Sequence, residues 1–309
     1  MGPLSMKPFL FGLLVIGLLA WAPLVLNDYG TGLLLGLTGY ATLATAWAMF
    51  SGPTRYVSLA TVAFFGIGAY TVAVLSETLP YPLVLVVAAL IGLSVSLVVG
   101  LATLRLAGVY FVIFSFGLAE LVRQTVTWYE VNVTGTLGRY IFLPLEARHI
   151  YWQLLALLVL TLLIGIYMRK SRIWLALVAV GDDEVAARHA GVDVTRTKLA
   201  LFALSATIIT LVGAIQAPRW TYVEPTIVFN PTISFLTLVM ALLGGAGKLW
   251  GPIVGAIPLF LLFEWLSANF PNHYSIILGG IFILIVFAVP NGILARLETL
   301  GQRRKGEAQ

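Results

Sequence analysis

Charged side chains are rare in this chain and concentrate in one stretch, GDDEVAARHAGVDVTRTK at residues 181–198. Only 10% of all residues are charged, yet seven charged residues lie within this stretch. Consecutive carboxylates bind a cation such as Ca²⁺ when further oxygen ligands stand nearby. The neighbours here are alanines, which offer no side-chain oxygen, so the sequence argues against a metal site.

Patterns typical of enzymes and nucleotide-binding proteins are missing from the sequence. GAGK at 245–248 resembles the end of a loop in which glycines and a lysine surround nucleotide phosphates. That loop requires a glycine where this chain has Leu242, and a serine or threonine where it has Leu249. The chain also has no cysteine and no HExxH motif. We therefore expect no catalytic residue, no metal and no ATP bound by this chain itself.

The composition places these residues in a membrane protein. Hydrophobic residues make up 60% of the chain and the mean hydropathy is +0.99. Apolar runs approach the roughly 20 residues that a helix needs to cross a hydrocarbon core. The backbone there must be helical, because lipid offers it no hydrogen-bond partner. The ten candidate spans are 9–26, 31–50, 57–76, 81–104, 107–127, 151–168, 199–217, 231–248, 252–268 and 274–290.

We therefore expect an all-α polytopic integral membrane protein, a single transmembrane domain over residues 1–309 with about 8–10 transmembrane helices. The first apolar segment is long enough to span and is interpreted as a retained helix rather than a cleaved signal peptide. The segments 57–76, 107–127 and 231–248 are short or interrupted, which suggests broken or re-entrant helices. Five spans in each half would make the halves an inverted repeat, as in many transporters.

The positive charges indicate the orientation, because Lys and Arg concentrate in the cytoplasmic loops of membrane proteins. With both termini in the cytoplasm, fourteen of the eighteen Lys and Arg residues lie inside. The stretch 181–198 then faces the cytoplasm, and the net charge of +5 needs no nucleic-acid partner. The fourteen are Lys7, Arg55, Arg105, Arg169, Lys170, Arg172, Arg188, Arg196, Lys198, Lys248, Arg296, Arg303, Arg304 and Lys305.

Glycine-rich stretches interrupt two of the apolar segments. In AFFGIGAYT (63–71) the glycines either break a helix beside a watery path or let two helices approach closely, and the sequence favours neither. LLGGAGKLWGP (242–252) is expected to form a turn between two helices. Broken helices can present their dipole ends to a polar substrate. The candidates for a substrate path or a broken helix are Gly66, Gly68, Tyr70, Tyr110, Glu120, Gly244, Gly245 and Gly247.

Ionisable residues within the apolar segments are few. Glu120 and Arg123 are three residues apart, so on a helix they share a face and can pair. Intramembrane charges often mark transport pathways, so the pair is either structural or part of a substrate path. Glu264 lies close enough to the end of its segment to reach water.

Residues 182–190 of the charged stretch are predicted to form a short helix. Asp182, Asp183 and Glu184 would occupy its first turn, where carboxylates offset the positive end of the helix dipole. Alanines at positions 186, 187 and 190 would form a low-profile face, and Gly191 would end the helix. Such a helix fits a groove on a partner protein. The alternative is a solvated loop with one helical turn.

The stretch SRIWLALVAVGDDEVAARHAGVDVTRTKLALFALSA (171–206) resembles the cytoplasmic coupling segment of the membrane subunits of bacterial ABC importers. The chain as a whole is similar to the M-type permease subunit of the branched-chain amino acid permease family. Further matching motifs are VSLATVAFFGIGAYTVAVL (57–75), LRLAGVYFVIFSFGLAEL (104–121), YVEPTIVFNPTISFLTLVMALLGGAGKLWGPIVGA (222–256) and VPNGI (289–293).

This resemblance implies an importer of branched-chain or related amino acids that works by alternating access in the lipid of a bacterial inner membrane. The implied partners are a periplasmic or lipid-anchored substrate-binding protein, a second, H-type permease subunit and two cytoplasmic ABC ATPases. The ATPases would bind the ATP, so this chain would need no cofactor. Two alternatives are the same machinery importing urea or short amides, and an ATP-independent facilitator. The coupling loop would lie at about 169–198, with Asp183, Glu184, Ala186, Ala187 and Gly191 as its ATPase-coupling residues.

The chain departs from the family pattern at three places. Val185 stands where the coupling motif carries a glutamate, and Glu184 precedes it, which leaves the docking contact of Glu184 open. RYVSLA (55–60) lacks the glycines and the glutamine that usually precede the third span. VTGTLG (133–138) replaces the usual Leu-Thr-Gly-Gly after the fifth span. The last two changes leave the cargo open.

Overall fold

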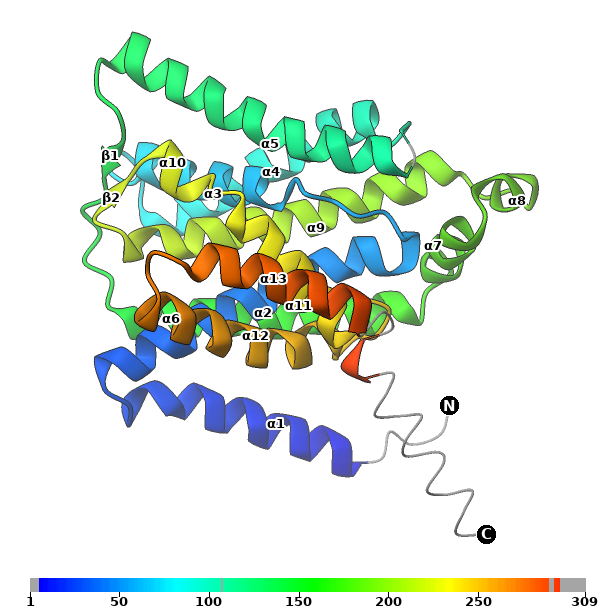
Figure 1. Cartoon of the computed structure of the whole chain (residues 1–309), viewed down its shortest axis with the longest axis horizontal. Helices are drawn as coiled ribbons and strands as arrows, with labels where there is room; N and C mark the ends of the chain where they lie inside the picture. Colours follow the sequence, from blue (N-terminus) through cyan, green and yellow to red (C-terminus); the bar gives the residue numbers. More distant parts are fainter. Residues whose placement is uncertain (1–5, 107, 289–291, 295–309) are drawn as a thin grey trace.

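The computed structural model of the chain describes residues 6–106, 108–288 and 292–294, and it is dominated by helices (Figure 1). The helices are α1 (Met6–Trp21), α2 (Asp28–Thr54), α3 (Thr61–Leu75), α4 (Tyr81–Thr103), α5 (Val109–Tyr129), α6 (Ala147–Arg169), α7 (Arg172–Asp182), α8 (Glu184–His189), α9 (Val194–Gln216), α10 (Pro225–Val228), α11 (Thr232–Gly244), α12 (Gly251–Asn269) and α13 (Tyr274–Ala288). A π-helical turn, η2 (Glu130–Thr134), extends α5, and the 3-10 turns η1 (Ala22–Leu24) and η3 (Ala217–Arg219) follow α1 and α9. A small antiparallel ribbon pairs β1 (Arg139–Tyr140) with β2 (Tyr222–Val223). Most of the motif at 289–293 and the basic residues from Arg296 onward lie outside the described residues.

Seven helices in the described part of the chain are long and apolar enough to cross a membrane. They are α2, α4, α5 with η2, α6, α9 with η3, the stretch from α10 to α11, and α12. Three shorter apolar helices, α1, α3 and α13, correspond to the other expected segments. Each of the ten apolar segments therefore contains a helix, and the all-α polytopic class predicted from the sequence is confirmed.

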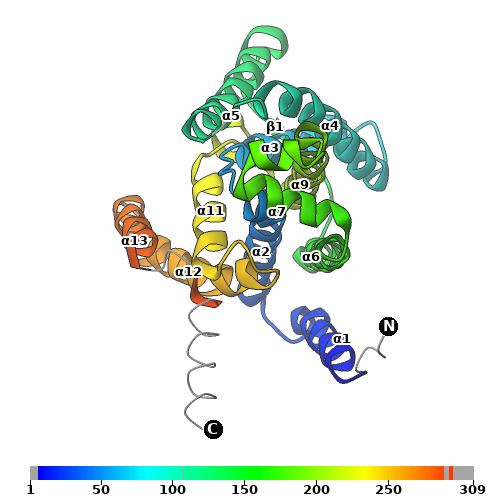
Figure 2. The same cartoon turned by 90° about the vertical axis from the view of Figure 1, so that its right-hand side faces the viewer.

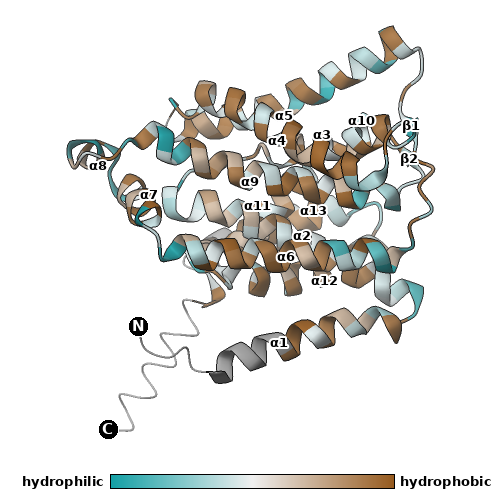
Figure 3. Cartoon of the chain, turned by 180° about the vertical axis from the view of Figure 1, so that it is seen from behind, coloured by the Kyte–Doolittle hydropathy of each residue, from teal (hydrophilic) through white to brown (hydrophobic). Residues whose placement is uncertain are grey.

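The spanning helices lie roughly side by side around α2 and α9 (Figures 1 and 2). The most apolar part of α2 is 78% buried within the chain, whereas that of α5 is only 17% buried. Figure 2 shows α1, α5 and α13 at the periphery. Figure 3 shows apolar residues along the spans and hydrophilic residues near α7 and α8 at one end and near the ribbon at the other. This banding fits a bundle that crosses a bilayer.

Close packing explains the glycines of α3. A Cβ atom on Gly68 would lie 1.9 Å from the carbonyl oxygen of Thr210 on α9, and one on Gly213 would lie 2.0 Å from that of Phe65. Helices approach this closely only through small residues. The helix from Thr61 to Leu75 is continuous, so a break within 63–71 is wrong and the alternative of close helix packing is correct.

The chain is instead non-helical just before α3, at residues 55–60. Arg55 has a left-handed backbone (φ 59°) that ends α2, and the following residues run back into the bundle (Figure 1). The 15 residues of α3 cover only about 22 Å at 1.5 Å per residue, so the extended stretch completes this passage. Its backbone has partners in the bundle: the indole N–H of Trp47 donates to the carbonyl oxygen of Ser58 at 2.7 Å.

The expected turn within 242–252 is confirmed. α11 ends at Gly244 and α12 begins at Gly251. Gly245 has φ 106°, a conformation that side chains with a Cβ rarely adopt. A Cβ on Gly244 would lie 1.7 Å from the carbonyl oxygen of Gly251, so the glycines bring the two helices together directly after the turn.

Candidate functional site

The charged stretch forms a polar corner beyond the ends of the spanning helices, built from α7, α8 and the start of α9 (Figures 1 and 3). Asp183 caps α8, because its carboxylate accepts hydrogen bonds from the backbone N–H groups of Val185 and Ala186 at 2.8 and 3.1 Å. The predicted helix over 182–190 is therefore shorter, and Asp182 is instead the last residue of α7. The reason is that an N-cap aspartate is extended, here with φ −156°, and separates the two helices.

The carboxyl end of α8 agrees with the prediction from the sequence. Ala190 is the C-cap, and Gly191 follows it with φ 86°. The N–H of Gly191 donates to the carbonyl oxygen of Arg188 at 3.1 Å, and that of Val192 donates to Ala187 at 3.1 Å. A left-handed glycine after the cap satisfies the last carbonyls of a helix in this way. The helix α8 is therefore capped at both ends.

The alanines of α8 do not form one outward face. Ala187 is only 3% exposed and packs with Val180 of α7 and Val194 of α9. Ala186 is exposed, and Val185 is 62% exposed. The surface that α8 offers to another molecule therefore centres on Val185 and Ala186, whereas Ala187 attaches the helix to the rest of the chain.

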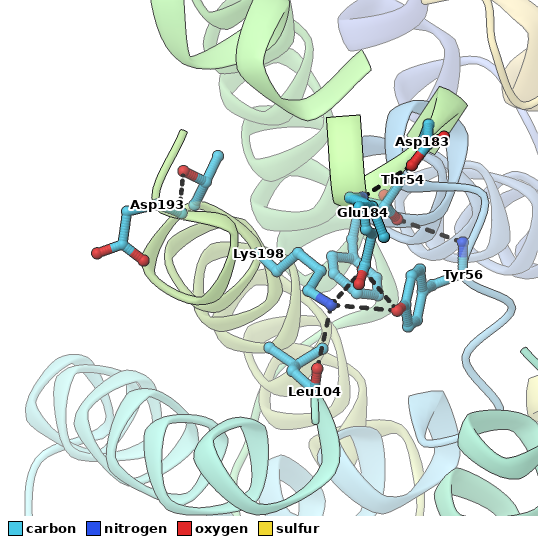
Figure 4. Close-up of polar contacts among 10 residues, drawn as sticks. Thr54, Tyr56, Leu104, Asp183, Glu184, Asp193 and Lys198 are labelled. Carbon is cyan, nitrogen blue, oxygen red and sulfur yellow. Dashed lines mark hydrogen bonds and ion pairs between the residues drawn. The ribbon is translucent and has the colours of Figure 1, made fainter. Parts of the chain in front are cut away.

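Glu184 also points into the chain (Figure 4). Its carboxylate accepts hydrogen bonds from the hydroxyl of Tyr56 at 2.7 Å and from the ammonium of Lys198 at 2.5 Å. Burial alone would raise the pKa of Glu184, but these two bonds, with the charges of Lys198 and Arg188, outweigh burial and lower it. Glu184 is thus held ionised and is an internal anchor of α8 more than an outward docking contact.

Sequence reasoning missed Tyr56 as part of this site. It lies 128 residues before Glu184 in the chain, and a tyrosine after a helix end carries no signal of such a contact. Lys198 was placed correctly in the charged block, but nothing in the sequence indicated that its side chain is only 3% exposed.

The polar residues of α5 lie on the least buried of the seven long apolar helices that the structure describes. Arg123 donates to Glu120 through Nε at 2.9 Å and through Nη2, and Gln124 donates to Glu120 at 2.8 Å. The predicted pair is confirmed, and the Glu120 side chain remains 41% exposed. Tyr110, near the start of α5, is 75% exposed.

The remaining candidates for a substrate path lie within packed regions or at the α11–α12 turn. Gly66 faces the ring of Phe229, which also stacks on buried Tyr70 at 5.8 Å between ring centroids. Gly68, Gly244 and Gly245 serve the close approaches and the turn described above. Gly247 lies in that turn and accepts a hydrogen bond from Arg169 at 3.0 Å. The structure does not bring these residues together with Glu120 into one site.

The bundle of long apolar helices, with α8 at one end, defines a polytopic membrane protein. Residues 31–287 match the family described as branched-chain amino acid transport system permease components, and the chain belongs to this family.

Individual relatives agree with this assignment. The chain is 27% identical to the high-affinity branched-chain amino acid transport system permease protein LivM of Salmonella typhimurium, and 28% identical to LivM of Escherichia coli. Both matches cover 98% of this chain and 78% of the relative. The ribose import permease protein RbsC of Escherichia coli is 26% identical over 40% of each chain. No solved structure matches the chain significantly.

Proposed function

We propose that this chain is the membrane-spanning permease subunit of an ABC importer for branched-chain amino acids. The chain is a non-catalytic component of the transporter, and separate subunits hydrolyse the ATP. Its family and the seven long apolar helices among the described residues support a multi-pass protein of the inner membrane. The distribution of Lys and Arg supports cytoplasmic termini, and the packing of the spans around α2 and α9 supports one transmembrane domain.

The observation that carries the coupling role is α8, a capped helix held outside the spans with Val185 and Ala186 exposed. An exposed apolar side chain on a short helix suits a groove on a partner. We infer that this partner is one of two cytoplasmic ABC ATPases. The other partners of the importer would be a homologous H-type permease subunit and a substrate-binding protein on the outer side.

Val185→Asp tests the docking role of α8. We expect the co-purification of the ATPase subunits and the uptake of leucine each to fall about tenfold, since the loss of roughly 1.4 kcal/mol of binding free energy has that effect. The matched control is Thr195→Asp, which places the same charge on an exposed residue in the first turn of α9. Full ATPase retention and uptake in Val185→Asp would refute the docking role.

The exposed polar face of α5 supports a second part of the proposal, that this face borders the substrate path. Ionisable residues at the middle of a spanning helix are unfavourable in lipid and usually face protein or water. Glu120 and Arg123 lie near the middle of the span Val109–Thr134, which is the least buried of the seven long apolar helices in the described residues. We infer that their face meets the second permease subunit and a watery passage.

Cysteine labelling tests this face directly, because the natural chain contains no cysteine. We expect Gln124→Cys in the assembled importer to react with a water-soluble maleimide. Ile283→Cys on exposed α13 is the control and is expected to stay unlabelled, because an apolar surface residue there faces lipid. If both positions react equally, or neither reacts, the assignment of the α5 face is wrong.

A further inference from the structure

Lys198 carries a buried charge that neither the docking of α8 nor the passage of a solute explains. It lies in the second turn of α9, and its side chain is 3% exposed. A buried ammonium group is tolerated only where other groups replace the water that it loses. The identity of those groups shows which parts of the chain Lys198 connects.

The partners of the ammonium group come from three other parts of the chain (Figure 4). Besides Glu184 of α8, Lys198 donates to the hydroxyl of Tyr56 at 3.1 Å and to the carbonyl oxygen of Leu104 at 3.1 Å. The ammonium also lies 4.5 Å from the centre of the Tyr56 ring, which is within the range of a cation–π contact.

Each partner connects to a different spanning element. Leu104 is the C-cap of α4, where carbonyl groups lack helical partners and the helix dipole is negative. Tyr56 belongs to the extended stretch that leads from α2 into α3. One ammonium group therefore joins α8 to α9, to the end of α4 and to the entry of α3.

The helices α3, α4 and α9 form one packed unit. A Cβ on Gly68 of α3 would lie 1.9 Å from Thr210 of α9, and one on Gly92 of α4 would lie 2.5 Å from the same residue. Elements packed this closely move together more readily than they deform. A displacement of α9 at Lys198 is thus passed to α3 and α4.

We propose that Lys198 is a positioning residue that transmits the motion of α8 to the unit of α3, α4 and α9. This inference rests on the proposed function, in which an ATPase moves α8. If α8 moved alone, it would pull Glu184 away and leave the buried ammonium group without its counter-charge, which is strongly unfavourable. The helix and the unit therefore move together.

A second ion pair at the same corner provides the matched control. Arg55 and Asp182 also join the end of α2 to the α7–α8 corner, at 2.6 Å, but their side chains are 70% and 59% exposed. Exposed pairs contribute little because water and salt screen them. The control variant is the double substitution Arg55→Gln/Asp182→Asn.

The test compares Lys198→Met, Glu184→Gln and the control in importers purified with their own partner subunits and reconstituted in liposomes. Three quantities are measured: the ATPase that co-purifies, the ATP hydrolysed, and the leucine taken up per ATP. We expect Lys198→Met to keep the ATPase and to hydrolyse ATP, while uptake per ATP falls at least about 5-fold, a typical size for coupling between sites. Glu184→Gln keeps the size and one acceptor oxygen but removes the negative charge. We expect it to change the same ratio in the same direction, and the control to leave it unaltered.

Unchanged uptake per ATP in both Lys198→Met and Glu184→Gln would overturn the inference. A lower amount of folded protein with an unchanged ratio would also overturn it, since that result assigns the residue a purely structural role. If Lys198→Met fails to assemble, the uptake per ATP measured for Glu184→Gln decides whether the inference holds. If no ATPase co-purifies with the natural chain, the proposed function itself fails, and this outcome is distinct from failure of the inference.

Discussion

Gly68→Ala is expected to destabilise the protein, although alanine is the better helix former. The added methyl group would lie 1.9 Å from the carbonyl oxygen of Thr210 and 2.9 Å from the backbone nitrogen of Ala214. Ordinary van der Waals contact of a Cβ atom begins at 3.4 Å, so α3 and α9 must separate by roughly 1.5 Å. The obstacle is backbone rather than a side chain that can rotate, so separation of the two helices is the only relief.

The expected loss of stability is about 3 kcal/mol, at the upper end of the range for overpacked cores. It should appear as a decrease of roughly 5 °C or more in the thermal midpoint of the purified protein in detergent. The control is Gly279→Ala on α13, where an added Cβ would meet no atom within 4 Å. There the better helix propensity of alanine, about 1 kcal/mol, should leave the midpoint unchanged or raise it. Equal midpoints for the two variants would contradict the close approach of α3 and α9.

Hydropathy predicted the spanning helices well, because the length of an apolar run follows directly from the thickness of the hydrocarbon core. It could not decide whether the glycines of 63–71 break a helix or let it pack, since both uses need a residue without a side chain. The decision depends on α9, which lies more than a hundred residues further along the chain. Gly68 and Thr210 become neighbours only after the chain has folded.

The coupling segment was predicted in outline and not in its contacts. Capping follows local rules, so Asp183 and Gly191 were recognisable as residues at the ends of a helix. The inward position of Ala187 and the burial of Lys198 depend on how α7, α8 and α9 meet. In a sequence, a buried lysine looks the same as one at the membrane surface.

Both the polar corner and the extended stretch at 55–60 show how distant parts of this chain supply hydrogen-bond partners to buried polar groups. Lys198 has three hydrogen-bond partners. The non-helical backbone around Leu59 likewise receives partners from distant helices, because lipid cannot supply them. The buried polar groups therefore also determine which helices must stay together.

Ser234 supplies two of these hydrogen bonds at the start of α3. Its hydroxyl accepts a hydrogen bond from the N–H of Val62 at 2.9 Å and donates one to the carbonyl oxygen of Leu59 at 2.9 Å. The first N–H groups of a helix have no partner within the helix, so this serine of α11 acts as the cap of α3. Its side chain is buried, and no bulk water reaches it to replace the hydroxyl.

Ser234→Ala is therefore expected to leave one buried donor and one buried acceptor without a partner. Each such group costs about 1–3 kcal/mol, which predicts a loss of roughly 3 kcal/mol and a thermal midpoint several degrees lower. The control is Ser94→Ala on α4, whose hydroxyl is exposed and bonds only to a carbonyl of its own helix. The carbonyl group that loses this hydroxyl lies within α4 and keeps its place in the helix. The thermal midpoint should therefore stay within about 1 °C of that of the unsubstituted protein. If Ser234→Ala has the same thermal midpoint as Ser94→Ala, the extended stretch does not depend on α11 for its hydrogen bonds. Residues 55–60 and α3 must then be held in place by apolar packing alone.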